Sequence, residues 1–452
     1  MQEPDLPRCW SREYDFASDD CLRSIQNEKL TVLVPFLYEN SGFYRRRFDR
    51  LSMVPSDIRT VDDLPRWPVV TKEEMSHDAM EHPPLGTYLT IGAEEWASRG
   101  WMHFSTSGST GTPRAFRYTH VDRTYFAWAN IRALQSMGIT RGESVFLIGG
   151  FGPHVWLWGV YEALMQMQAA VIPGGGLDAV ARAIMIQRFS PTVIACTPSY
   201  ALYLGRVMQE RGSDPASSSV HTVFLGGEPG VSIGSTRMRI EKLWNARAVE
   251  FYGCTEASPH VGGFSCTHSN RNGEMPFAHL MEDVQIWETV DPVDHRAVSA
   301  GARGLTVCTS LNSESSPQLR FLVGDYATLQ RGECGCGRSH VRAMGSFAGR
   351  ADDLINLRGV KFFPSQIEEA IRSVAGVGDE FEIVLETTAD GLDVMTVRIE
   401  RADETVPEAA GDVIAAAIRS HCEVRAAVAL LAPNTLPKTE FKAKRVRDQR
   451  IR

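Results

Sequence analysis

The sequence has no run of about 18 apolar residues, the length that a membrane-spanning helix requires. Its first residues, MQEPDLPRCWSREYDF, contain no apolar segment of the kind found in a signal peptide. Nine cysteines among 452 residues do not make a disulfide framework. We therefore expect a protein that does not enter a membrane and that works in the reducing cytoplasm.

The chain also has no excess of positive charge, because it contains 47 lysines and arginines but 55 aspartates and glutamates. The net charge of −8 at pH 7 argues against nucleic acid or an anionic membrane as the main partner. What the chain has is an ordinary globular balance, with 43% hydrophobic and 23% charged residues. Its length exceeds one compact core of usual size, so we expect two or three domains.

Short apolar runs, most of them ending in glycines, alternate with helical patterns in the middle of the chain. The runs are VFLIGG (145–150), AAVIPGGG (169–176), TVIACTPS (192–199) and TVFLGGEPG (222–230). Helices are expected between them at 155–168 and 177–189, and before them at 18–50 and 119–138. This alternation predicts an α/β fold with mostly parallel strands, which binds ligands at the carboxyl ends of its strands.

The pattern changes beyond about residue 350. FEIVLETT (381–388) and DVMTVRIE (393–400) predict a β-hairpin, and VIAAAIRSHC (413–422) predicts a helix. We therefore expect a small α+β domain of residues 350–452 after a large domain of residues 1–349.

The stretch FSTSGSTGTPRAF (104–116) has six hydroxyls in eight residues, two glycines between them and Arg114 just after. Glycines let a backbone approach a ligand closely, and successive N–H groups form an anion nest to which Arg114 adds positive charge. Phosphate is the expected ligand, although the stretch is not the Walker pattern GxxxxGK[ST]. The alternative is a solvent loop rich in turn-forming residues.

Two further motifs carry groups that suit a nucleotide. In YGCTEAS, Tyr252 can stack on a base, Thr255 can bond a phosphate oxygen and Glu256 can hold Mg²⁺, which prefers oxygen ligands. In VGDYATL, Asp325 follows an expected strand, where a carboxylate can bond a ribose diol. Each motif alone is also typical of a surface turn, and the basic stretch LPKTEFKAKRVRD is also typical of a solvated tail.

Taken together, the motifs resemble those of the adenylate-forming superfamily of acyl-CoA synthetases, adenylation domains and luciferases. Five occur in the same order: TSGSTGTPR, YGCTE, GDY, GRADDLINLRG and the C-terminal lysine motif in LPKTEFKAKRVRD. Nearly the whole chain resembles the phenylacetate-CoA ligase branch, through stretches such as FLYENSGFYRRRFDRL, DLPRWPVVTKEEM and GRADDLINLRGVKFFPSQIEEAI. The resemblance implies a large N-terminal domain that binds ATP and acid, and a small mobile C-terminal lid.

The resemblance also implies a role for each motif residue. Phosphates of ATP would be bound by Thr106, Ser107, Gly108, Ser109, Thr110, Gly111 and Arg114. The adenine would be lined by Gly227, Glu228 and Pro229, with Tyr252 stacked on its ring. The ribose would be held by Asp325 and Arg350. Thr255 would contact the α-phosphate and Glu256 would coordinate Mg²⁺.

The implied reaction has two steps. A carboxylate attacks the α-phosphate of ATP, pyrophosphate leaves and an acyl-adenylate remains. Lys442 matches the lysine that stabilises the charge gathered in this step. The C-terminal domain then rotates about a hinge near 350–353, at Asp352, and the thiol of CoA attacks the adenylate.

The substrate pocket is expected from the aromatic stretch FGPHVWLWGVY, which follows a strand. His154, Trp156, Tyr200 and Gly253 are candidate pocket residues, since flat substrates pack well against rings. Core packing is the alternative for such rings. An aryl or arylacetic acid is the expected substrate.

Two departures from the family pattern keep other functions open. Phe441 precedes Lys442 where the motif usually has glycine, and CTEASPHVGG replaces a Gly-Pro-Gly segment that borders the acyl site. An adenylating enzyme that passes its product to an amine or a carrier-protein thiol, or that activates a small oxyanion such as nitrite, is the second interpretation. A non-catalytic nucleotide-binding relative is the third, and the intact Glu256, Asp325 and Lys442 disfavour it.

The pair Cys334 and Cys336, in ECGCGR, raises the question of a metal. Cys-x-Cys alone is also typical of buried thiols. Some relatives in the branch carry zinc on a similar set, in which the histidine precedes an x-x-Glu-Asp step. Here His279 precedes LMED, whereas His268 does not. The resemblance therefore implies a structural zinc on Cys266, His279, Cys334 and Cys336, and it allows a homodimer.

Overall fold

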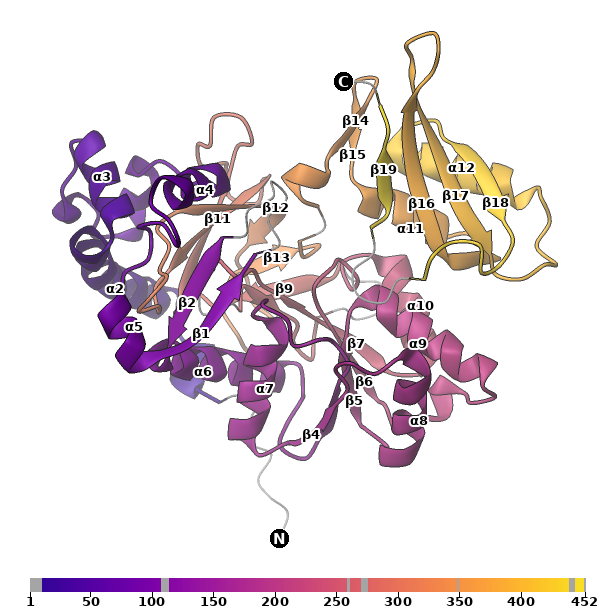
Figure 1. Ribbon diagram of the computed structural model, residues 1–452, viewed down its shortest axis with the longest axis horizontal. Helices are drawn as coiled ribbons and strands as arrows, with labels where there is room; N and C mark the ends of the chain where they lie inside the picture. Colours follow the sequence, from indigo (N-terminus) through magenta and orange to yellow (C-terminus); the bar gives the residue numbers. More distant parts are fainter. Residues whose placement is uncertain are drawn as a thin grey trace. The chain divides into compact units, whose positions relative to one another are not determined.

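The computed structural model describes residues 10–106, 114–257, 261–269, 275–347, 349–438 and 444–450 (Figure 1). The chain divides into two compact units, each built from three segments. The first unit comprises Met1–Glu143, Gly150–Val171 and Phe251–Ser346, and the second comprises Ser144–Gly149, Ile172–Glu250 and Phe347–Arg452. Within the described ranges, no helix has both the length and the apolar character that crossing a membrane requires.

The first unit begins with helices. They are α1 (Arg12–Asp15), α2 (Asp19–Asn40), α3 (Gly42–Arg50), α4 (Lys72–Glu81) and α5 (Ala93–Arg99), with 3-10 turns η1 (Pro55–Asp57) and η2 (Val61–Arg66) between α3 and α4. The segment predicted to be helical, 18–50, is broken once, at Ser41. The Ser41 hydroxyl accepts the N–H of Tyr44 and so caps α3 just as α2 ends.

A hairpin and two helices follow in the same unit. They are β1 (Gly100–Ser105), β2 (Ala115–Thr119), α6 (His120–Ser136) and α7 (Trp156–Met167). The predicted helix 119–138 is confirmed as α6, and its first turn is closed by a reciprocal cap between Thr119 and Asp122. Because β1 pairs with β2, the two ends of the serine- and threonine-rich loop are held together, with Ser105 opposite Ala115.

The sheet of the first unit is antiparallel. Its strands run in the order β10-β11-β12-β13-β9-β8, and β8 pairs with the last two residues of β7. The bounds are β7 (Arg247–Tyr252), β8 (Gly263–Phe264), β9 (Phe277–Leu280), β10 (Gln285–Val290), β11 (Arg303–Ser310), β12 (Phe321–Gln330) and β13 (Arg342–Met344).

The parallel strands lie in the second unit, in the order β7-β6-β5-β3. Their bounds are β3 (Ser144–Leu147), β5 (Val193–Cys196) and β6 (Thr222–Leu225); β4 (Ala170–Pro173), α8 (Ala179–Phe189), α9 (Pro198–Glu210), η3 (Pro215–Ser217) and α10 (Gly234–Trp244) belong to the same α/β pattern. Buried side chains of α8, α9 and α10 form one core with those of the parallel strands. The predicted α/β class is thus confirmed.

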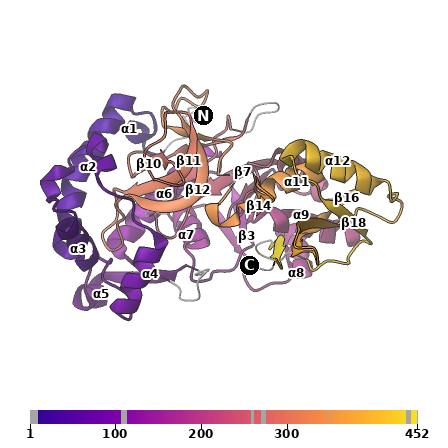
Figure 2. The same ribbon diagram turned by 90° about the horizontal axis from the view of Figure 1, so that it is seen from above.

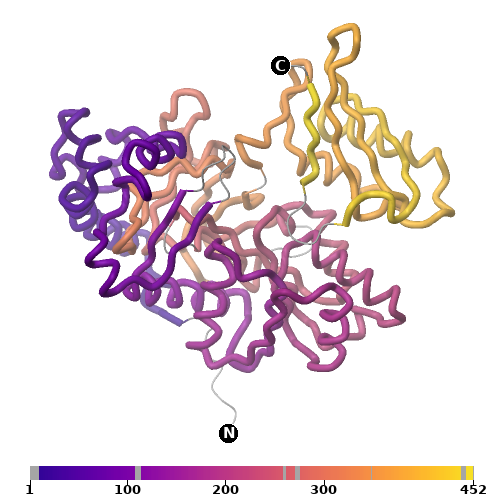
Figure 3. The backbone as a smooth tube through the Cα atoms, viewed as in Figure 1, coloured from indigo at the N-terminus to yellow at the C-terminus, as the bar shows by residue number. Residues whose placement is uncertain are grey.

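The C-terminal residues of the second unit build a smaller sheet. The elements are η4 (Ala351–Asp353), β14 (Ile355–Leu357), β15 (Val360–Phe362), α11 (Pro364–Arg372), β16 (Val377–Thr387), β17 (Asp393–Arg401), α12 (Ala410–Cys422), β18 (Ala427–Leu431) and β19 (Val446–Asp448). The predicted hairpin is confirmed as β16 and β17 (Figure 3). Helices α11 and α12 cover one face of the sheet β18-β17-β16-β19 and share its core (Figure 2). The boundary at residues 349 and 350 stays a prediction.

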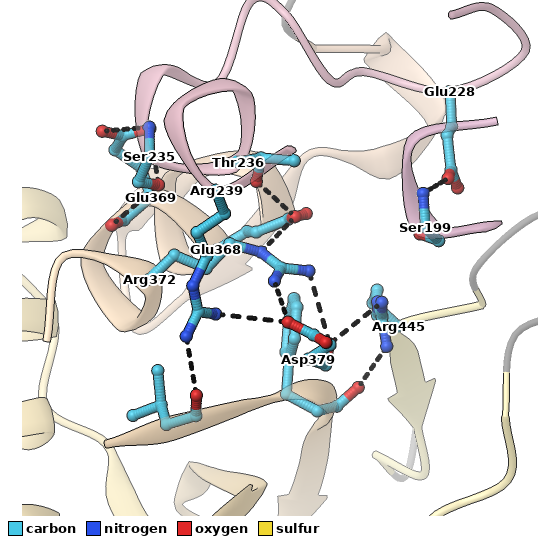
Figure 4. A network of polar contacts seen from close by, with 12 residues as sticks. Ser199, Glu228, Ser235, Thr236, Arg239, Glu368, Glu369, Arg372, Asp379 and Arg445 are labelled. Atoms are coloured by element: carbon cyan, nitrogen blue, oxygen red, sulfur yellow. Dashed lines mark hydrogen bonds and ion pairs between the residues drawn. The ribbon is translucent and has the colours of Figure 1, made fainter. Parts of the chain in front are cut away.

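Polar side chains join α10 to these C-terminal residues (Figure 4). The backbone N–H and the hydroxyl of Ser235, at the start of α10, both donate to Glu369 of α11 at 3.1 Å. The hydroxyl of Thr236 donates to Glu368 at 2.8 Å. Asp379 of β16 is contacted by three guanidinium groups, those of Arg206, Arg239 and Arg372. We call this set of contacts the polar seam.

The most deeply buried charges of the first unit surround Arg132 of α6. The guanidinium bonds Asp283 through two parallel contacts of 2.8 and 2.9 Å and Asp15 through one of 2.8 Å, and all three side chains are almost fully buried. Burial raises the pKa of Asp283, but the charge of Arg132 outweighs that effect and holds this pKa below its usual range. The cluster thereby ties α1 and α6 to the turn before β10.

We expect Asp283→Ala to lower the free energy of unfolding by about 3–5 kcal/mol, because it leaves part of a buried guanidinium without its counter-charge. Urea unfolding followed by far-UV circular dichroism measures the change. Glu28→Ala, which removes an exposed carboxylate of α2, is the matched control and should change stability little. Equal effects of the two substitutions would contradict a stabilising role for this cluster.

Candidate functional site

The turn that follows β7 carries Thr255 and Glu256 and is fastened by two buried side chains. The hydroxyl of Tyr118, on β2, donates to the carbonyl of Thr255 at 2.9 Å. The side-chain amide of Gln285, on β10, donates to the carbonyl of Ala257 at 2.9 Å. Both anchoring side chains are fully buried, so they hold the turn in one position. The sequence motifs did not point to either anchor, although alternation along β2 is enough to predict burial of Tyr118.

An ion pair joins the phosphate-loop arginine to the expected Mg²⁺ ligand. Arg114 Nη2 lies 2.8 Å from Glu256 Oε1, and each side chain is only 8% exposed. The Nε of Arg114 and the hydroxyl of Thr106 are buried and have no partner among the described residues. Groups of this kind can be satisfied by a bound anion or by water. Ser107, Gly108, Ser109, Thr110 and Gly111 lie outside the described residues.

Tyr252 and Asp325 form the next pair, because the hydroxyl of Tyr252 donates to the Asp325 carboxylate. Asp325 was expected after a strand, and that is wrong: it lies inside β12. The register of β12 with β11 shifts opposite Leu305–Val307, and Gly324 has a positive φ of 87°. This irregularity gives the sequence the pattern of a strand end, although the pairing continues beyond it.

The carboxyl ends of β5 and β6 also hold predicted residues. The Glu228 carboxylate accepts the N–H of Ser199, in the first turn of α9, at 2.7 Å (Figure 4). A Cβ on Gly230 would lie 2.2 Å from Pro198, so the two turns pack directly against each other. Tyr200 is buried in the same place. Gly227 and Pro229 flank Glu228 in this turn.

The remaining predicted residues lie elsewhere. His154 is half-buried ahead of α7, and burial lowers its pKa. Trp156 is buried in the first turn of α7, and Gly253 follows β7.

Two residues of the predicted hinge, Arg350 and Asp352, form an ion pair of 3.6 Å. Lys442 lies outside the described residues.

Four metal-ligand atoms meet in the first unit: one each from Cys266, His279, Cys334 and Cys336, all within 4.8 Å of one another. Cys266 Sγ lies 3.8 Å from Cys334 Sγ, and Cys336 Sγ lies 3.4 Å from His279 Nε2. His279 Nδ1 lies 3.3 Å from the carbonyl of His340, which leaves Nε2 facing the sulfurs. The ring of His268 is not part of the set.

The pKa values of His279 and of two of the cysteines are shifted by their contacts with one another. Burial lowers the pKa of His279, but its contacts with Cys266 and Cys336 outweigh that effect and raise it to about 9. The contact with Cys334 lowers the pKa of Cys266, and the contact with Cys266 lowers the pKa of Cys336. The donor set of three sulfurs and one imidazole nitrogen is one that zinc prefers.

Comparison with known proteins places these sites in a family. The model of the family described as "AMP-binding enzyme" matches residues 102–302, and that of the "AMP-binding enzyme C-terminal domain" matches residues 359–450. The chain is 32% identical to a phenylacetate-coenzyme A ligase of Thermus thermophilus, over 95% of this chain and 97% of the relative. The chain belongs to the AMP-binding enzymes, in the phenylacetate-CoA ligase-like branch. It is accordingly an enzyme of the AMP-forming acid–thiol ligase class.

Further relatives in this branch match over equal lengths. The phenylacetate-coenzyme A ligase of Pseudomonas putida is 29% identical over 99% of this chain and 98% of its own. Among solved structures, 2-hydroxyisobutyryl-CoA ligase in the postadenylation state with 2-HIB-AMP has a TM-score of 0.91 at 28% identity, over 99% of this chain and 94% of that one. The same ligase with 2-HIB-AMP and CoA in the thioesterification state has a TM-score of 0.73.

Proposed function

We propose that this enzyme adenylates a carboxylic acid with ATP and transfers the acyl group to the thiol of CoA. The observation that carries the proposal is the buried pair of Arg114 and Glu256, beside the orphaned hydroxyl of Thr106. Glu256 supplies a buried carboxylate for magnesium, and Arg114 supplies a positive charge for the triphosphate through an Nε that has no partner among the described residues. Relatives named as CoA ligases over nearly the whole chain support the same reaction.

The nucleotide would be bound by the residues that the motifs predict. Arg114 and the 106–111 loop would bind the phosphates, and Glu256 would hold Mg²⁺, which neutralises charge on the phosphates when it is bound. Tyr252 would stack on the adenine, and Asp325 would bond the ribose together with Arg350. Because Arg114 and Glu256 already neutralise each other, the site bears little net charge before the nucleotide arrives.

The proposed chemistry asks the chain for position and charge. Thr255, on its fastened turn, would orient the α-phosphate, and Lys442 would stabilise the charge that gathers there as the carboxylate attacks. Withdrawal of Lys442 by rotation about Asp352 would then open the site to the CoA thiol. The two states named for 2-hydroxyisobutyryl-CoA ligase, postadenylation and thioesterification, support such a two-step cycle. Mg²⁺, the cytoplasmic location and a homodimer remain predictions.

We propose that the acid is aryl or arylacetic and that its pocket is lined by His154, Trp156, Tyr200 and Gly253. Pyrophosphate exchange into ATP tests the class of acid, with aryl, arylacetic and aliphatic acids and nitrite each assayed with and without CoA. Exchange that depends on an acid, with AMP release that rises with CoA, is the expected result. AMP formation that ignores CoA would favour an amine or a carrier-protein thiol as the acceptor.

Lys442→Ala should slow adenylation about 100-fold or more, because the developing charge loses its preorganised cation. The same variant should form thioester from a supplied acyl-adenylate at nearly the wild-type rate. Lys444→Ala, at an exposed lysine two positions further along the sequence, is the matched control and should leave both half-reactions intact. Equal loss of both half-reactions in Lys442→Ala would refute the role given to this lysine.

We also propose that Cys266, His279, Cys334 and Cys336 hold a structural zinc that fastens the loops after β8 and β12. Elemental analysis should find about one zinc per chain, as expected for a closed four-ligand site. Cys334→Ser should lose the metal and stability together, whereas Cys21→Ser, at an exposed cysteine, should lose neither. A metal-free wild-type protein of equal stability would remove this proposal.

A further inference from the structure

Arg182 of α8 is a buried arginine without a carboxylate partner. Eight arginines of the described residues are buried, and seven of them form an ion pair with a carboxylate: Arg47, Arg114, Arg132, Arg237, Arg320, Arg338 and Arg372. Arg182 is only 9% exposed and has no such pair within the part of the chain that the structure describes. A buried charge without a partner is costly, so its presence requires an explanation.

The guanidinium is held, but only partly satisfied. Its Nε donates to the carbonyl of Gly174 at 3.1 Å and its Nη1 to the hydroxyl of Tyr200 at 2.6 Å. Its carbon lies 4.9 Å from the centre of the Tyr200 ring. A guanidinium has five N–H donors, and no other described residue accepts from this one. Gly174 and Tyr200 therefore orient the fork, and its remaining donors are left for a ligand.

The fork lies where parallel strands end. Gly174 follows β4, and its N–H donates to the carbonyl of Leu147, the last residue of β3, at 2.9 Å. Tyr200 lies in the first turn of α9, just after β5. Ligands of parallel α/β sheets bind at these carboxyl ends. Glu228, after β6, accepts the N–H of Ser199.

We propose that Arg182 and Tyr200 form an anion subsite of the acid pocket, and that the substrate carries a second carboxylate besides the one that is adenylated. This inference rests on the proposed function. In that function one carboxylate is adenylated, so the carboxylate held by Arg182 is a second one. The substrate class is therefore a dicarboxylic acid, aliphatic or aromatic.

A matched panel of acids tests this subsite by pyrophosphate exchange. Each dicarboxylic acid is compared with the monocarboxylic acid of the same skeleton: succinate with butyrate, glutarate with valerate, isophthalate with benzoate, and 4-carboxyphenylacetate with phenylacetate. For the wild-type enzyme we expect at least one dicarboxylic acid to exceed its partner about 100-fold in kcat/KM, since a bidentate arginine–carboxylate contact is strong and geometrically selective.

Variants at the fork separate recognition from folding. Arg182→Gln should remove most of the preference for the dicarboxylic acid, mainly through KM, so that the ratio of kcat/KM between the two acids of a pair falls towards one. Arg182→Lys keeps the charge but loses the planar fork, so it should restore only part of the preference. Thermal unfolding gives a readout independent of turnover: the preferred dicarboxylic acid should raise the Tm of the wild type but not that of Arg182→Gln. Without ligand, Arg182→Gln should change stability little, because the loss of the bonds to Gly174 and Tyr200 is offset by removal of a buried charge that has no counter-charge.

The possible results distinguish failure of the proposed subsite from failure of the proposed adenylating function. Exchange with monocarboxylic acids that equals or exceeds exchange with their dicarboxylic partners would overturn the subsite and leave the adenylating function standing. A ratio that Arg182→Gln does not change would do the same. Destabilisation of both variants without ligand would show that Arg182 serves the fold instead. No exchange and no stabilisation with any acid would overturn the proposed function itself.

Discussion

The requirement that a buried guanidinium meet a carboxylate organises much of this protein. Arg132 forms its ion pairs with Asp15 and Asp283, and these pairs join the N-terminal helices to α6 and to the start of β10. Arg114 forms its ion pair with Glu256, in the turn that carries the adenylate motif. The two pairs obey the same physics but differ in their surroundings. Every charged atom of Arg132 has a partner, whereas the Nε of Arg114 is buried with none among the described residues.

A ligand anion can therefore bond the open Nε of Arg114, whereas each guanidinium nitrogen of Arg132 already has a carboxylate partner. Removing a carboxylate from the Arg132 cluster leaves a buried charge uncompensated. A partly satisfied cluster is less stable than it can be, and binding of an anion completes it. The orphaned hydroxyl of Thr106, next to the same loop, has the same character. Arg182 is the extreme case, because it has a tyrosine and a carbonyl to orient it but no carboxylate among the described residues.

Much of the fold could be predicted from the sequence because hydrophobic period reports burial directly. The buried strand at VFLIGG, the helix that became α6 and the hairpin of β16 and β17 all follow this signal. Asp325 could not be placed, because a local irregularity in β12 imitates a strand end. Period also says nothing about which partner a buried polar group finds. The roles of Tyr118 and Arg182 therefore could not be predicted from the sequence, since they depend on atoms that are distant along the chain.

Resemblance to the family was most useful for predicting sites whose chemistry requires several residue types together. The cysteines and His279 are spread over 71 residues of sequence, from Cys266 to Cys336, and no local pattern joins them; yet the structure brings their ligand atoms within 4.8 Å of one another. For the adenylate motif, resemblance supplied the role of Glu256 but not its neutralisation by Arg114.

The polar seam joins the C-terminal residues to α9 and α10 within the second unit. They have a hydrophobic core of their own, around β16, β17, α11 and α12, distinct from the core of α8 to α10. The contacts between these two cores include hydroxyls, carboxylates and guanidinium groups, such as Ser235 with Glu369 (Figure 4). Water can replace such contacts at modest net cost, whereas separating two apolar faces exposes surface that water does not stabilise. A polar seam between complete cores is therefore the kind of joint that the proposed rotation about Asp352 requires.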